Sequence, residues 1–124
     1  MAADDRTAAQ ARWLALTRDE LPAVAQERDW PVHADHCFQR IFLDNACEGV
    51  WYDHIPGRPA YLHADRAVLD RAIALAEEAL AGTVSLSLLN RRSLAWRRRH
   101  RADRCRLIVE AADPAHVQAR CDEP

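Results

Sequence analysis

The sequence predicts an all-α protein, a single small bundle of four to five helices. Apolar residues recur at helical spacings in several segments. The chain has three glycines and no stretch of alternating apolar and polar residues, and its one strand-like run is 106–110. With 124 residues, of which 49% are hydrophobic and 29% charged, the chain is expected to form one soluble globular unit.

The first helical segment is predicted to run from about Asp5 to Gln26. Thr17 and Glu20 have the spacing of a capping box, and Pro22 does not fit inside a helix because it lacks a backbone N–H. We therefore expect a break or kink near residues 17–22. The apolar positions that recur at helical spacing are Trp13, Leu14, Leu21, Val24 and Ala25.

A second helix is expected over about residues 36–47, with Asp35 as its N-cap and Gly49 as its stop. Asn45 falls in the middle of its apolar face, where a polar side chain needs hydrogen-bond partners. Residues 50–63 contain two prolines and a glycine and are predicted to form a long ordered loop. The core-facing stripe of the helix consists of Phe38, Ile41, Phe42, Asn45 and Ala46.

Two further helices are expected, one over about residues 65–81, closing at Gly82, and one over about residues 85–99. Residues 1–99 are therefore predicted to form a helical domain, and residues 100–124 a poorly ordered, arginine-rich C-terminal tail. The apolar stripes of these two helices consist of Leu69, Ala72, Ile73, Ala76 and Leu80 in the first, and of Leu86, Leu89, Leu94 and Trp96 in the second.

Charge is distributed unevenly along the chain. All 17 basic residues are arginine and the formal net charge is −2, a composition typical of a bacterial genome of high GC content. Residues 91–106 hold eight arginines against one aspartate. This segment could neutralise several phosphates, so nucleic-acid binding is one alternative. It contains no zinc-finger, RRM or KH signature, and we favour the interpretation that it is a solvated arginine-rich terminus that also pairs with acidic residues 65–78.

The chain is expected to be cytoplasmic. Its N-terminus, MAADDRTAAQ, has neither the basic nor the apolar region of a secretory signal, and no apolar run approaches the roughly 20 residues that span a bilayer. The four cysteines form no C-x-x-C pair, which favours reduced thiols. They are Cys37, Cys47, Cys105 and Cys121.

A polar and aromatic pocket is predicted between the helix over 36–47 and the loop over 50–63. Asp44 and Asn45 would orient the loop or a ligand, Arg58 would pair with an anion, and aromatic side chains would form the walls. In the alternative reading, Asp44 and Asn45 only bind backbone groups of the loop. The expected partner is a small anionic ligand or a protein segment, and the oligomeric state stays open. The candidate ligand-binding residues are Asp44, Asn45, Trp51, Tyr52, Asp53, His54, Arg58 and Tyr61.

The stretch HADHC suggests metal binding or catalysis, each beside a plainer interpretation. His33 and His36 are weak candidates for a zinc pair, because no second pair stands at a known ligand spacing. Cys37 near a helix N-terminus could act as a nucleophile, with His36 or His54 as acid–base groups. A capped helix start with two half-exposed histidines and an ordinary buried cysteine explains the same residues. We therefore predict no metal and no cofactor, and lean against an enzyme; if the protein is one, we expect a transferase.

The central sequence is similar to a family of short bacterial proteins, many of which carry the label of a GNAT-type acetyltransferase. The similarity covers about residues 10–98 and rests on HCFQRIFLDN, WYDH, RPAY and LNRRSLAWR. Through that label, the resemblance implies acetyl transfer as an alternative function. The GNAT turn that binds acetyl-coenzyme A has the form R/Q-x-x-G-x-G/A. Gly49, Gly57 and Gly82 do not form it, so no GNAT site residue is assigned here.

Overall fold

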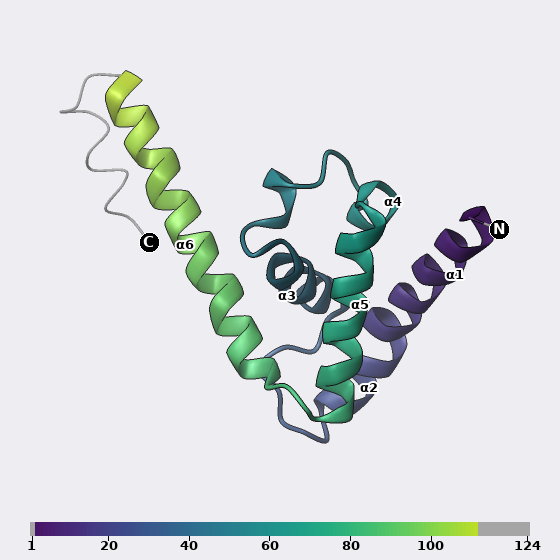
Figure 1. The fold of residues 1–124 in the computed structure, drawn as a ribbon. Helices are drawn as coiled ribbons and strands as arrows, with labels where there is room; N and C mark the ends of the chain where they lie inside the picture. The colour runs from purple at the N-terminus through teal and green to yellow at the C-terminus, as the bar shows by residue number, and fades with distance from the viewer. Residues whose placement is uncertain (1, 112–124) are drawn as a thin grey trace.

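The computed structural model describes residues 2–111 of the 124-residue chain. Throughout these residues the secondary structure is helical and no strand is present, so the predicted all-α class is confirmed. Figure 1 shows the arrangement: α5 (Arg66–Ala81) packs between α1 (Ala2–Ala15) and α3 (Asp35–Cys47), and α3 packs in turn against α6 (Leu86–Ala111). None of the helices in this part of the chain is long and apolar enough to cross a membrane.

The first helical rod changes its pitch where the sequence predicts a break. α1 passes into a π-helical turn, Leu16–Glu20, and then into α2, Leu21–Ala25. The Leu21 N–H donates to the Leu16 carbonyl, the i→i−5 bond of a π turn, which accommodates Pro22 in the first turn of α2. The expected capping box is wrong, because the backbone stays helical at this point. The hydroxyl of the buried Thr17 instead donates to the Trp13 carbonyl at 3.0 Å.

α3 forms the centre of the core. Its N-cap is Ala34, one residue before the predicted Asp35, whose carboxylate accepts from the His36 N–H at 2.8 Å. The helix ends at Glu48, which adopts the left-handed conformation (φ 55°) that was expected of Gly49. The buried residues of α3 are Phe38, Ile41, Phe42, Leu43, Asp44 and Ala46.

The predicted loop over residues 50–63 is ordered and contains two short helical turns. These are η2 (Trp51–Asp53), a 3-10 turn, and α4 (Ala60–His63). Between them the Arg58–Pro59 peptide bond is cis. Gly57 lies so close to α4 that a Cβ there would fall 2.6 Å from the His63 ring. Glycine therefore allows the loop to fold back onto α4.

The last helix is longer than the sequence predicts. α5 ends as expected at Gly82, with φ 85°, and the Ser85 hydroxyl caps α6 by accepting from the Leu88 N–H. α6 continues to Ala111, through residues 100–111 that were assigned to a poorly ordered tail and through the strand-like run 106–110. Arginine, alanine and leucine favour helix here, and an Arg106–Asp103 ion pair one turn apart supports it. The remaining tail, 112–124, lies outside the described residues.

Candidate functional site

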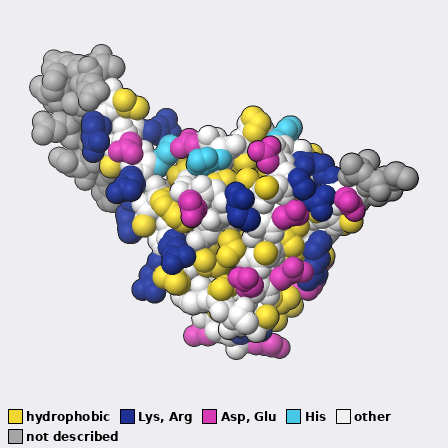
Figure 2. Space-filling model, in the orientation of Figure 1, with side chains coloured by type: hydrophobic (Ala, Val, Ile, Leu, Met, Phe, Trp, Pro, Cys, Tyr) yellow, Lys and Arg dark blue, Asp and Glu magenta, His cyan; other side chains and the backbone are white. Residues whose placement is uncertain are grey.

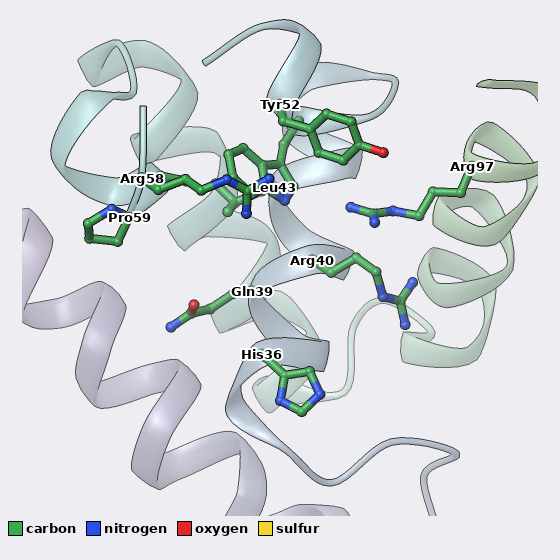
Figure 3. A pocket seen from close by; sticks show the side chains of 10 residues that line it. His36, Gln39, Arg40, Leu43, Tyr52, Arg58, Pro59 and Arg97 are labelled. Carbon is green, nitrogen blue, oxygen red and sulfur yellow. The ribbon is translucent and has the colours of Figure 1, made fainter. Parts of the chain in front are cut away.

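A hollow of about 380 Å³ opens where α3, the loop over 50–63 and α6 meet, and we call it the central pocket. Figure 3 shows its labelled side chains, with Arg58 on the loop and Arg97 on α6 extending toward each other from opposite sides, and Arg40 extending from α3 toward α6. The pocket is lined by His36, Gln39, Arg40, Leu43, Trp51, Tyr52, Arg58, Pro59, Ala60 and Arg97.

Aromatic rings hold two of the three arginines. The Arg58 guanidinium carbon lies 4.9 Å from the Trp51 ring centroid and 5.9 Å from that of Tyr52, and the Arg97 carbon lies 5.5 Å from that of Tyr52. Trp51 and Tyr52 meet edge to face at 5.6 Å. Cation–π contacts restrict the guanidinium planes without using their N–H donors. The donors of Arg58 therefore remain available to a bound anion.

Asp44 organises the pocket from beneath, fully buried. One carboxylate oxygen accepts from the Trp51 backbone N–H at 3.0 Å and from Arg97 Nη2 at 3.2 Å. The other oxygen accepts from Ser93 Oγ at 2.6 Å and from Arg97 Nε at 2.8 Å. A single carboxylate thus joins α3 to the start of η2 and to α6, and its four hydrogen bonds compensate for burying the charge.

Arg40 extends this network to the neutral side chains of α6. Its guanidinium donates to Ser93 Oγ at 2.7 Å and to Asn90 Oδ1 at 2.9 Å. Neither Arg40 nor Arg58 forms an ion pair among the side chains that the structure describes, whereas Arg97 pairs with Asp44. The central pocket therefore carries an excess of about two positive charges.

The structure brings together part of the predicted ligand-binding set. Trp51, Tyr52 and Arg58 line the central pocket, and the backbone of Trp51 is bound by Asp44 as the plainer interpretation expected. Asp44 itself lies behind the pocket wall, fully covered by its partners.

The expectation for Asn45 is corrected. Its amide donates to the Ile41 carbonyl at 2.7 Å and to the Leu89 carbonyl at 3.0 Å, so it joins α3 to α6 and not to the loop. The arc of α3 in which it lies faces α6, and backbone carbonyls of both helices provide the partners that a polar side chain needs there.

The other three predicted ligand-binding residues lie apart from the central pocket. Asp53 and His54 border a separate hollow on the other flank of α6, where Asp53 contacts His100 Nε2 at 3.0 Å. Tyr61 packs against the core, and its carbonyl accepts from the Gln10 side chain.

Sequence reasoning missed Arg40 as a pocket residue and assigned Arg97 only to the basic segment. A signal was present in the sequence. Asn90, Ser93 and Arg97 are spaced i, i+3 and i+7, so they form a polar stripe on one helix face. The stripe continues the helix face that carries Leu86 and Leu89. Because those two leucines are buried, the stripe faces the core as well.

The candidate catalytic and metal residues do not form a site. Across the described residues, no group of three or more His, Cys, Asp or Glu side chains is arranged to hold a metal ion. His33 and His36 are exposed, Cys37 is half-buried, and His54 lies on a different hollow from His36.

The surroundings of Cys47, at the end of α3, disfavour its thiolate form. Burial raises the pKa of Cys47, the Asp44 carboxylate raises it further, and Arg71 opposes this only in part. A raised pKa lowers the thiolate fraction at neutral pH, and the thiolate is the nucleophile.

Comparisons of this chain with known protein families, curated proteins and solved structures found no match. The resemblance to the bacterial family therefore stays a prediction.

Proposed function

We propose that this protein is a small cytoplasmic binding module whose central pocket takes an anionic ligand with a flat body, such as a nucleoside monophosphate. The observation that carries the proposal is the convergence of Arg40, Arg58 and Arg97 on one hollow with a single carboxylate beneath them. Arginine donates planar pairs of N–H groups that match phosphate and carboxylate oxygens. Trp51 and Tyr52 provide the apolar surface that the body of the ligand would contact.

The contacts of Arg58 suit a role in binding an anion better than a role in stabilising the fold. Arg58 is exposed and contacts two aromatic rings, whereas Arg40 and Arg97 also connect helices. Substitution of Arg58 should therefore remove an anion contact and leave the fold unchanged, which makes it the residue of choice for a test.

The test is isothermal titration calorimetry with uridine monophosphate, inorganic pyrophosphate and uncharged uridine at low ionic strength. We expect both anions to bind and uridine not to bind measurably. Arg58→Gln should weaken anion binding about tenfold or more, the value of one charge-assisted hydrogen bond. Arg66→Gln removes an equal charge from α5, away from the pocket, and should leave the affinity within about twofold. Equal effects of the two substitutions would contradict the proposal.

A further inference from the structure

The central pocket is not isolated, because two further hollows share its walls. One lies under the loop and is bordered by Trp51, Tyr52 and Arg58, which also line the central pocket. The other lies along α6 and shares Tyr52 and Arg97 with the central pocket. Tyr52 borders all three, and its side chain is 39% exposed. The three hollows therefore adjoin one another around Tyr52, and we call them together the Tyr52 groove.

Arginines line the whole length of the Tyr52 groove. Arg98 and Arg101, both exposed, extend it along α6 beyond Arg97. Together with Arg40, Arg58 and Arg97 they make five arginines, and no aspartate or glutamate lines any of the three hollows. Figure 2 shows arginine side chains spaced along the arm that α6 forms at one side of the molecule. Each of the three hollows is thus bordered by at least one arginine.

The opposite flank of α6 has a different character. There Arg99 lines a hollow together with Glu48, Asp53 and Asp103, so positive and negative charges are mixed. Arg97, Arg98 and Arg101 thus border a hollow without acidic side chains, whereas Arg99 borders the hollow that contains them. The anion-attracting flank is the one that continues into the central pocket.

We infer that the Tyr52 groove binds single-stranded nucleic acid, with the central pocket holding one nucleotide and α6 following the phosphates. This inference rests on the proposed function of the central pocket and names its ligand class. Groove arginines interleaved with aromatic rings are the combination that single strands need, because arginines neutralise phosphates while rings and guanidinium planes stack on unpaired bases. Trp51, Tyr52 and the arginines over their rings provide such surfaces.

An acidic protein segment fits the same groove less well. Peptides gain affinity by pairing with a sheet edge or by inserting apolar side chains into a deep groove. The described part of the chain has no sheet edge, and the apolar residue of the α6 hollow, Leu94, is 42% exposed on an open surface. A base-paired duplex fits less well too, because its bases are stacked inside the helix and cannot reach Trp51 or Tyr52.

The experiment uses fluorescence anisotropy of a 3′-fluorescein-labelled oligouridylate of twelve nucleotides with the full chain. We expect it to bind at least tenfold more tightly than uridine monophosphate, since more phosphates are engaged. With five arginines in contact, log K should fall with log salt at a slope of about −3.5. A twelve-base-pair RNA duplex and a peptide of twelve glutamates should both bind at least tenfold more weakly than the single strand.

Two double variants with the same loss of charge on α6 isolate the groove. The first variant combines Arg98→Gln and Arg101→Gln, which both change the groove flank. It should weaken oligouridylate binding tenfold or more and make the salt slope less steep by about 1.4. Arg92→Gln with Arg99→Gln changes positions outside the groove and should weaken binding less than threefold. All four side chains are exposed and glutamine favours helix about as well as arginine, so both variants should keep the wild-type circular dichroism.

The outcomes separate this inference from the proposed function. If uridine monophosphate binds in an Arg58-dependent way but oligouridylate binds no more tightly, the groove is refuted and the pocket stands. Equal weakening by the two double variants overturns the inference, because it shows non-specific attraction. If the glutamate peptide binds as tightly as oligouridylate, the inference is overturned and the ligand of the groove is an acidic protein segment. If neither anion binds, both proposals fail.

Discussion

The buried carboxylate of Asp44 gives the sharpest prediction about stability. Asp44→Asn keeps the shape of the side chain and removes its charge. The remaining amide oxygen can still accept from the Trp51 N–H, but the new NH₂ group faces Arg97 and Ser93, which now donate toward it. The substitution therefore removes the charge-assisted part of the network without creating a cavity.

The magnitude follows from the partners that Asp44 loses. Removing one member of a buried ion pair costs about 3–5 kcal/mol, and a hydrogen bond to a charged group contributes about 1.5–3 kcal/mol. The Arg97 side chain is 26% exposed, so water solvates part of its charge after the substitution. We therefore expect Asp44→Asn to lower the free energy of unfolding by about 2–3 kcal/mol, below the cost for a fully buried pair.

Urea unfolding followed by circular dichroism at 222 nm measures this loss. The matched control is Asp70→Asn, which breaks an exposed i,i+4 pair with Arg66 and should cost about 0.3–0.5 kcal/mol. A double-mutant cycle with Arg97→Met should give a coupling free energy of about 1–2 kcal/mol. The reasoning is refuted if Asp44→Asn costs no more than Asp70→Asn, or if its cost is unchanged when Arg97 is absent.

Three further predictions follow from other contacts. Asn45→Ala should lower the free energy of unfolding in urea by about 1–2 kcal/mol, because it removes the amide that joins the Ile41 and Leu89 carbonyls; an unchanged midpoint would contradict this. Gly82→Ala should lower the melting temperature by about 4 °C, since φ of 85° strains any residue with a Cβ although the space around it is empty; a wild-type melting curve would count against it. Cys47 should react with iodoacetamide at pH 8 several-fold more slowly in the folded chain than in urea, as its raised pKa requires, and equal rates measured by peptide mass spectrometry would disprove that.

The sequence predicted correctly those features that depend on the residues of a single helix. The periodicity of Phe38, Ile41 and Phe42 is local to one helix, and so is the glycine at position 82 that ends α5. Both were predicted because spacing and backbone preference act within a few residues. Pro22 indicated an irregularity in the helix for the same reason, although the form it takes, a π turn in a backbone that stays helical, was not foreseen.

The pocket was predicted only in part because it depends on how helices meet. Arg58 and the aromatic walls lie in one loop, and their composition alone suggested a site. Arg40 and Arg97 are separated by more than fifty residues and come together only because α3 packs against α6. Asn45 was placed correctly on the apolar face, but which neighbour that face contacts is tertiary information. The error about Asn45 follows from that missing contact.

The most direct test of the central claim is an NMR titration of the ¹⁵N-labelled protein with inorganic pyrophosphate. The three-arginine pocket predicts saturable shifts of the side-chain Nε–H signals of Arg40, Arg58 and Arg97 and of the Trp51 indole N–H. The indole signals of Trp13, which is fully buried, and of Trp30, which packs against Phe38, should not move. Shifts spread evenly over all arginines, or none at the pocket, would contradict the account.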